Sequence, residues 1–218
     1  MTLVVKICGL STRATLDAAL EGGADMVGLV FFPASPRHVE LDSARELARA
    51  AAPQAEVVAL TVDADDAQLG AIIAAVSPQL LQLHGHETPQ RVAAIKQRFQ
   101  LPVMKALPIA TAADLAVLPD YAAVADRLLF DARPPKDATR PGGLGACFDW
   151  TLLQGIELAV PYMVSGGLSP ANVAEALRIS RATGVDVSSG VESAPGVKDP
   201  ELIRAFIRAA RATEQLSV

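Results

Sequence analysis

Short apolar runs alternate with longer amphipathic stretches along the whole chain. The short runs are rich in aliphatic residues, whereas the longer stretches are rich in alanine. The first pattern predicts buried strands and the second predicts helices that bury one face. The predicted strands are Leu3–Cys8, Met26–Phe31, Val57–Val62, Leu80–His84, Val103–Leu107, Arg127–Asp131, Tyr162–Ser165 and Val185–Ser188. The predicted helices include Thr12–Glu21, Ser43–Ala51, Asp65–Val76, Pro89–Phe99, Ala112–Leu118, Pro170–Ser180 and Pro200–Ala212.

Strict alternation of strand and helix is typical of a parallel sheet that is covered by helices. Eight such units fit a closed (β/α)8 barrel better than an open doubly wound sheet. At 218 residues the barrel would be compact, since roughly 250 residues are typical. Pro134–Gly145 is rich in proline and glycine and is interpreted as one long loop after the sixth strand. We therefore predict an α/β protein in which residues 1–218 form a single-domain (β/α)8 TIM barrel.

Composition indicates whether the protein is folded, which partners it can bind and which compartment it occupies. Hydrophobic residues make up 51% of the chain, which excludes a disordered protein. The net charge of −5 comes without a basic cluster, so we expect no nucleic-acid or membrane partner. The two cysteines cannot build a disulfide framework, and Met1–Leu10 does not resemble a signal peptide. The longest apolar stretch, Met26–Ser35, is too short to span a bilayer. We expect a cytoplasmic protein.

Glycines follow the last two predicted strands. Gly166 and Gly167 come after the seventh strand, and Ser189 and Gly190 come after the eighth. Functional residues of (β/α)8 barrels lie at these carboxyl ends, and phosphate sites recur after strands seven and eight. Glycine lets backbone N–H groups approach an anion closely, beside the positive end of the next helix. The pattern favours a phosphate site. The alternative is that these glycines only supply turns.

An ordered set of motifs at the strand ends resembles the phosphoribosylanthranilate isomerase family, from residue 4 to Asp199. The resemblance implies a single-domain barrel enzyme of tryptophan biosynthesis that uses no cofactor and no metal. It implies an Amadori rearrangement of N-(5-phosphoribosyl)anthranilate to 1-(2-carboxyphenylamino)-1-deoxyribulose 5-phosphate, and it leaves monomer or homodimer open. The motifs are Val5-Lys6-Ile7-Cys8-Gly9, Gln82-Leu83-His84-Gly85, Phe148-Asp149-Trp150, Ser165-Gly166-Gly167-Leu168 with Asn172-Val173, and Asp186-Val187-Ser188-Ser189-Gly190-Val191-Glu192.

The resemblance also implies a role for individual residues. Cys8 would be the general base, Asp131 the general acid and Arg37 the partner of the substrate carboxylate. Opening a furanose and then removing its C2 proton requires an acid and a base, and a planar guanidinium suits a carboxylate. Without the resemblance, Cys8 would be a small buried residue, Asp131 a helix cap or ion-pair member, and Arg37 a surface charge. The phosphate would be held by Gly166, Gly167, Ser189 and Gly190.

Residue parity predicts a buried ion pair. Lys6 and Cys8 are two positions apart, so both face the barrel interior, about 6.6 Å apart along the strand. A buried lysine needs a partner. Asp186 has the interior parity of Ser188, on the strand that lies beside the first strand in a closed barrel. We therefore predict a Lys6–Asp186 pair beneath the site, which would reduce the help that Lys6 gives to a Cys8 thiolate.

The remaining polar residues carry weaker signals. His84 and His86 have the same parity, but no further ligands complete a metal set, so we expect no metal. We expect His84 to line the site; the alternative is that it fills the rim. Cys147 is interpreted as a structural or accidental thiol. In the loop after strand six, Leu144 stands where the family has Thr or Ser, which removes a hydroxyl donor.

Other phosphosugar barrels remain alternatives. A ribulose-phosphate epimerase would need metal ligands, and an indole-3-glycerol-phosphate synthase would need a lysine–glutamate pattern that these strand ends lack. A non-catalytic phosphosugar-binding barrel would keep the glycine loops but would have no reason to keep Cys8 and Asp131 at strand ends. Turnover of the substrate distinguishes these alternatives.

Overall fold

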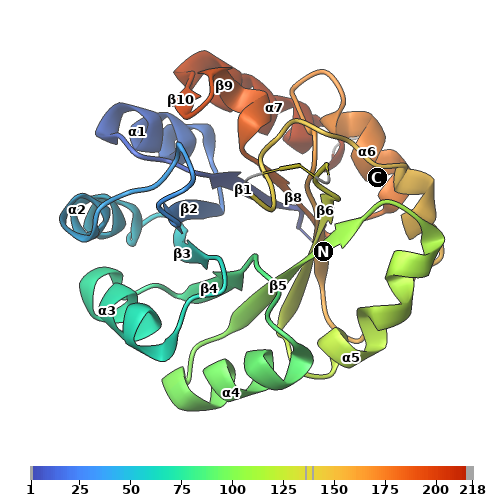
Figure 1. The fold of residues 1–218 in the computed structure, drawn as a ribbon. Coiled ribbons are helices and arrows are strands. Elements are labelled where there is room, and N and C mark those ends of the chain that lie inside the picture. Colours follow the sequence, from blue (N-terminus) through green and yellow to red (C-terminus); the bar gives the residue numbers. More distant parts are fainter. Residues whose placement is uncertain (1, 136, 139, 215–218) are drawn as a thin grey trace.

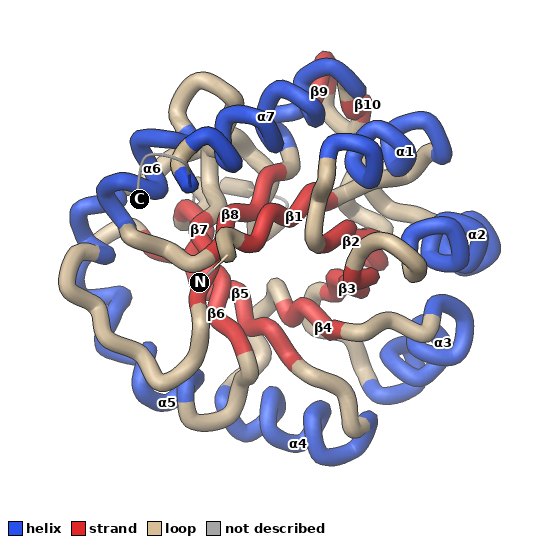
Figure 2. The backbone as a smooth tube through the Cα atoms, turned by 180° about the vertical axis from the view of Figure 1, so that it is seen from behind, coloured by secondary structure: helices blue, strands red, loops and turns tan. Residues whose placement is uncertain are grey.

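Eight parallel strands close into a barrel in the order β1 to β8, each paired with its neighbour in the sequence and β8 with β1. Helices form a ring around the strands (Figures 1 and 2). The computed structural model describes residues 2–135, 137–138 and 140–214. The predicted (β/α)8 barrel is therefore confirmed. The strands are β1 (Val4–Cys8), β2 (Met26–Phe31), β3 (Glu56–Thr61), β4 (Leu80–Leu83), β5 (Val103–Ile109), β6 (Arg127–Ala132), β7 (Tyr162–Val164) and β8 (Gly184–Val187).

The helices follow the strands, with one departure from a regular barrel. Between β6 and β7 the described chain forms only a short 3₁₀ helix, η2 (Trp150–Leu153), at the end of a long loop. Two further 3₁₀ helices are η1 (Ala112–Val117) and η3 (Ser189–Val191). The α-helices are α1 (Arg13–Gly22), α2 (Leu41–Ala51), α3 (Asp66–Val76), α4 (Pro89–Phe99), α5 (Leu118–Ala122), α6 (Val173–Ser180) and α7 (Pro200–Ala212).

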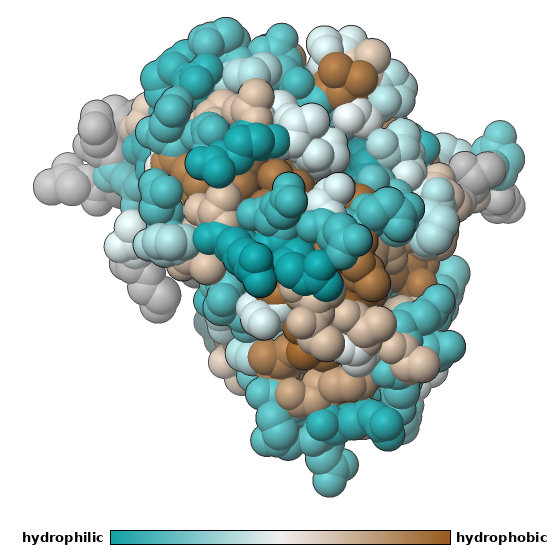
Figure 3. Space-filling model, turned by 90° about the vertical axis from the view of Figure 1, so that its left-hand side faces the viewer, coloured by the Kyte–Doolittle hydropathy of each residue, from teal (hydrophilic) through white to brown (hydrophobic). Residues whose placement is uncertain are grey.

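The helices pack through one apolar stripe each. In α7, Ile203, Phe206, Ile207 and Ala210 are buried, a spacing of three and four that places them on one face. The Asp199 side chain caps this helix by accepting hydrogen bonds from two backbone N–H groups of the first turn. On the side formed by α1 to α3, hydrophilic side chains interrupt the apolar areas (Figure 3). No helix in the described chain has the length and apolar character needed to cross a bilayer.

The barrel interior changes from apolar to polar along the strands. Its apolar cluster contains Met26, Val58, Leu80, Met104 and Leu129, one from each of five neighbouring strands. Because alternate residues of a strand face the same side, positions two residues further on also face inward. On β4 and β6 these are a glutamine and an aspartate. The polar side chains of these two strands therefore lie at the carboxyl end of the barrel, above an inner layer that is apolar except at β1 and β8, whose inward residues are charged.

Two helix starts differ from the prediction by two residues or more, and those of α1 and α3 by one. α6 begins at Val173, not at Pro170, because the Asn172 side chain binds the preceding loop: it donates to the Gly167 carbonyl and accepts from the Ser169 N–H. α2 begins at Leu41, two residues early, without a side-chain cap. A two-stranded hairpin after β8, β9 (Glu192–Ala194) and β10 (Val197–Lys198), was not predicted.

Candidate active site

One pocket opens to solvent at the carboxyl ends of the strands. Seven of the eight predicted site residues line it, and they come from six segments of the chain. The eighth, Gly190, does not line the pocket. The barrel thus gathers residues that are far apart in sequence at one rim. The lining residues among those predicted are Cys8, Arg37, His84, Asp131, Gly166, Gly167 and Ser189.

Cys8 ends β1 and is buried at the wall of the pocket. Burial raises the pKa of its thiol above the ordinary value. The positive charge of Lys6 opposes this shift, and the negative charge of Asp186 adds to it. The thiolate is therefore the minor form at neutral pH. The interior has no room for a side chain at Gly28, where a Cβ would lie 2.8 Å from the Cys8 sulfur.

The predicted Lys6–Asp186 pair is confirmed. The two residues lie directly opposite each other where β1 pairs with β8. Lys6 Nζ lies 2.9 Å from Asp186 Oδ1, and the side chains are 0% and 4% exposed. The Ser165 hydroxyl donates to the second oxygen of Asp186 at 3.3 Å. Burial alone would lower the pKa of Lys6, but Asp186 and Cys8 outweigh it and raise that pKa. Lys6 is therefore charged.

Asp131 lies near the end of β6, in contact with His84. His84 Nε2 is 3.1 Å from Asp131 Oδ2, and His84 Nδ1 is 3.1 Å from the amide nitrogen of Gln82. Because an amide nitrogen can only donate, Nδ1 accepts, and the ring proton sits on Nε2 and points at Asp131. The interior-facing Gln82 thus sets the tautomer of His84, and His84 orients the carboxylate.

His84 and His86 do not share a site. The imidazole of His86 is 93% exposed and contacts Asp63, whereas His84 faces the pocket. Parity failed here because β4 ends at Leu83, and the turn that follows no longer alternates. Among the described residues, no group of three or more His, Cys, Asp or Glu side chains is arranged to hold a metal ion.

Arg37 is buried and already holds a carboxylate. Its Nε and Nη2 donate to the two oxygens of Glu192, at 2.6 and 2.8 Å. Nη2 also donates to the Gly143 carbonyl at 3.1 Å. The remaining nitrogen, Nη1, lies beside Gly143, where a Cβ would be 2.5 Å away. Arg37 is thus a fixed guanidinium at the pocket wall and not the solvated surface charge of the alternative interpretation.

The two glycine loops pack against each other. Gly166 and Gly167 have φ of +79° and +64°, a region that disfavours side chains. At Gly190 a Cβ would collide with the Leu168 carbonyl, so this glycine allows the loop after β8 to approach the loop after β7. Within the described chain, no backbone acceptor engages the N–H groups of Gly167, Ser189 or Gly190. These N–H groups are available to an anion.

The long loop after β6 reaches over the pocket. Gly142 lies against Asp131 and His84, since a Cβ there would be 2.5 Å from Asp131 Oδ2 and 2.8 Å from His84 Nε2. The loop crosses the end of the barrel near β1 and β8 in Figure 1, where it is yellow. Leu144 lines the pocket with an exposed side chain. Cys147 contacts the Gly167 carbonyl, so it is part of the glycine-loop packing and not an accidental thiol.

Comparison with known proteins identifies the family. The family model for N-(5'-phosphoribosyl)anthranilate (PRA) isomerase matches residues 5–209. N-(5'-phosphoribosyl)anthranilate isomerase from Rhodopseudomonas palustris (strain BisA53) is 78% identical over 218 residues, all of both chains. The chain belongs to the phosphoribosylanthranilate isomerase family.

Solved structures agree with this assignment. Phosphoribosyl anthranilate isomerase from Thermotoga maritima superposes with a TM-score of 0.86 at 32% identity, over 97% of this chain and 100% of that one. A second structure of the family has a TM-score of 0.82 at 30% identity, again over 97% and 100% of the two chains. It is described as a complex with reduced 1-(o-carboxyphenylamino)-1-deoxyribulose 5-phosphate.

Sequence reasoning missed two charged residues of this isomerase site. Glu192 was noted only as the end of a motif, and Lys198 was not noted at all. Both are buried, and Lys198 Nζ lies 2.7 Å from Glu192 Oε1. Lys198 ends a hairpin outside the barrel and not a barrel strand, so no strand-end rule points to it. The sequence did contain one signal for these residues. Glu192 and Lys198 are six positions apart with Gly196 between them, a pattern typical of a hairpin with a short turn.

Proposed function

We propose that this isomerase converts N-(5-phosphoribosyl)anthranilate into 1-(2-carboxyphenylamino)-1-deoxyribulose 5-phosphate by an Amadori rearrangement, in tryptophan biosynthesis. The observation that carries the proposal is the pocket shared by Cys8 on β1 and Asp131 on β6, two strands that are not neighbours. A sugar ring bound between them would have an acid on one side and a base on the other. Family membership supports the substrate.

Asp131 is the proposed general acid. It donates a proton to the ring oxygen as the C1–O bond breaks, and the lone pair of the anthranilate nitrogen forms the C1=N bond. His84 orients the Asp131 carboxyl through the 3.1 Å contact. Gly142 and Gly166 pack closely around the same carboxyl and leave it little freedom to rotate. A fixed proton donor is what the first step requires.

Cys8 is the proposed general base. Its thiolate removes the C2 proton, and the electrons of that bond form the C1=C2 double bond while the C1=N pair returns to nitrogen. The enol then becomes the ketone by moving a proton from the oxygen to C1, so the reaction needs no oxidant or cofactor. Because the pKa of Cys8 is raised, the reactive thiolate becomes more abundant as the pH rises.

The two ends of the substrate are proposed to bind on opposite parts of the rim. Arg37 would bind the anthranilate carboxylate through Nη1, the nitrogen that Glu192 and Gly143 leave open. Backbone N–H groups at Gly166, Gly167, Ser189 and Gly190 would bind the phosphate, although Gly190 is not among the residues that line the pocket. Phe32 and Leu144 line the same pocket and would offer apolar surface to the anthranilate ring.

Substitution of the two reacting groups tests the mechanism. Cys8→Ala and Asp131→Asn should each lower kcat by about 10²–10⁴ with little change in KM, because each removes one acid–base group. In the unchanged enzyme, the pH profile of kcat/KM should contain a limb set by the raised pKa of Cys8, and this limb should be absent from Cys8→Ala. Cys147→Ala is the matched control: its contact with Gly167 permits a change in KM, but the pH profile should persist.

The mechanism would be wrong if Cys8→Ala kept its activity with the same pH profile. No turnover of the substrate by the unchanged protein would instead favour the non-catalytic phosphosugar-binding alternative.

We further propose a cytoplasmic location, in keeping with two free cysteines. The choice between monomer and homodimer stays a prediction that analytical ultracentrifugation decides.

A further inference from the structure

The β9–β10 hairpin brings two buried charges to the back of the pocket. Glu192 begins the hairpin and Lys198 ends it, and their side chains are 4% and 1% exposed. The residues between them are largely exposed. A surface hairpin that buries only its two charged ends is anchored through those charges. What the charges contact therefore indicates the purpose of the hairpin.

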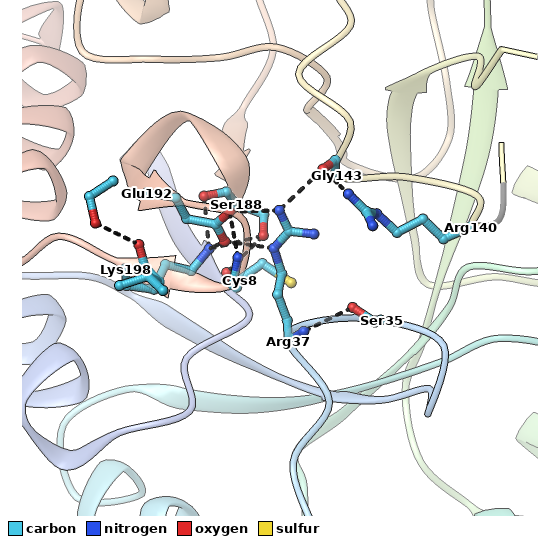
Figure 4. A network of polar contacts seen from close by, with 11 residues as sticks. Cys8, Ser35, Arg37, Arg140, Gly143, Ser188, Glu192 and Lys198 are labelled. Atoms are coloured by element: carbon cyan, nitrogen blue, oxygen red, sulfur yellow. Dashed lines mark hydrogen bonds and ion pairs between the residues drawn. The ribbon is translucent and has the colours of Figure 1, made fainter.

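The Glu192 carboxylate is the centre of a polar network (Figure 4). It accepts two hydrogen bonds from Arg37, one from Lys198 and one from the Gly196 N–H, at 2.6 to 3.1 Å. Lys198 also donates to the carbonyl and the hydroxyl of Ser188, at 2.8 and 3.0 Å. The Ser188 hydroxyl in turn donates to the Cys8 carbonyl at 3.1 Å. The network connects the proposed carboxylate-binding residue to the strand that carries the proposed base.

The charges of this network do not cancel. With Lys198 protonated, two cations, Arg37 and Lys198, surround one carboxylate and the cluster carries a net charge of +1. Burial and the charge of Arg37 lower the pKa of Lys198, whereas Glu192 raises it. Burial alone would raise the pKa of Glu192, but Arg37 and Lys198 outweigh it and lower that pKa. Glu192 therefore stays ionised. A buried excess of positive charge favours a bound anion, and Arg37 is the member of the cluster that lines the pocket.

The geometry of the guanidinium decides how that anion can bind. A free arginine can offer a carboxylate two parallel N–H groups on either of its edges. Here Glu192 occupies the edge formed by Nε and Nη2, and it fixes the guanidinium plane. Among the contacts of the described residues, Nη1 donates no hydrogen bond, so it is the nitrogen left for a ligand.

We propose that Glu192 is a positioning residue that orients Arg37 for the substrate carboxylate, with Lys198 keeping the cluster positive. The orientation would select ligands that carry a carboxylate at this end. This inference rests on the proposed role of Arg37 and deepens it. It assigns the hairpin after β8 to recognition of the anthranilate end of the substrate, although the hairpin follows a phosphate-binding loop.

The test is a pair of substitutions that leaves the net charge unchanged. Glu192→Gln with Lys198→Met removes one negative and one positive charge, so the cluster stays at +1 and Lys198 is not left as an unpaired buried charge, while Arg37 loses its carboxylate partner. The probes are two competitive inhibitors: the reduced product, 1-(2-carboxyphenylamino)-1-deoxyribitol 5-phosphate, and the same compound without the carboxylate. The double variant should weaken the first by about tenfold or more and the second by less than about twofold.

A second experiment tests whether the weaker binding of the reduced product depends on Arg37. In an Arg37→Gln background, the same double substitution should weaken the reduced product no further, because residues that act through one group are non-additive. Glu87→Gln is the matched control. Glu87 forms the other buried Lys–Glu pair, with Lys105 at 2.7 Å, and is not part of the pocket wall. It should lower the Tm but affect both inhibitors equally.

Two results would overturn the inference. One is equal weakening of both inhibitors by the double variant. The other is the same loss with and without Arg37, which would mean a purely structural role. If Arg37→Gln itself left binding of the reduced product unchanged, the proposed role of Arg37 would fail first, and the experiment would show this separately. Circular dichroism spectra confirm that each variant is folded, and Glu192→Gln alone serves as a second variant if the double one is not.

Discussion

Removal of the Lys6 charge tests the energetic account of the barrel interior. Lys6→Met keeps the length of the side chain but leaves Asp186 without its ammonium partner. The pair is 2.9 Å long and almost wholly buried, and the only other side-chain donor to Asp186 is the 3.3 Å contact from Ser165 among the described residues. Breaking such a pair from one side costs about 3–5 kcal/mol, since it strands a buried charge.

Thermal unfolding followed by circular dichroism measures this cost. In a chain of this size each kcal/mol shifts the Tm by about 2–4 °C, so Lys6→Met should lower the Tm by roughly 6–20 °C. The double variant with Asp186→Asn removes both charges and should recover at least half of the loss. Lys96→Met is the matched control, because Lys96 pairs with Asp126 at 2.8 Å but is 41% exposed. An exposed pair contributes at most about 1 kcal/mol.

The reasoning would be refuted by either of two results. Lys6→Met could cost no more than Lys96→Met, which would mean that burial does not govern the energy of the pair. Alternatively, the effects of Lys6→Met and Asp186→Asn could simply add. Strict additivity is the behaviour of residues that do not interact.

Two further predictions concern the rim. Arg37→Ala should raise KM by about tenfold or more with a smaller change in kcat, because the residue would bind the carboxylate and not the reacting carbons. A steady-state assay that follows the loss of substrate fluorescence measures both constants. An effect confined to kcat would contradict the prediction. Gly190→Ala should lower the Tm and abolish competition by inorganic phosphate, since its methyl group would push the loops after β7 and β8 apart. A variant that still bound phosphate normally would show that this contact is dispensable. Failure of phosphate to inhibit the unchanged enzyme would count against a phosphate site at these loops.

The sequence alone predicts the barrel and its buried ion pair because both follow from periodicity. Alternation of strand and helix determines the topology, and parity on two strands that must meet when the barrel closes pairs Lys6 with Asp186. The same rule fails for His86, because alternation ends with the strand. Parity works only where the backbone is extended.

The remaining features depend on loop paths, which have no simple period. Arg37 and Glu192 are 155 positions apart and meet only because two rim loops converge. Gly190 was predicted to bind phosphate, which stays a prediction; in the structure it contacts Leu168 and does not line the pocket. Cys147 contacts Gly167 for a similar reason. Such contacts depend on tertiary structure that no local pattern encodes.

The position of the Lys6–Asp186 pair has a consequence for synthesis of the chain. Its members are 180 positions apart, on the first and last strands of the barrel. At about 5–20 residues per second, Lys6 emerges from the ribosome roughly 10–40 s before its partner exists. During that time, burial of the Lys6 ammonium would carry the full desolvation cost of an unpaired charge. The early strands must therefore leave Lys6 accessible to water. The ion pair can therefore form only after the last strand of the barrel has been synthesised.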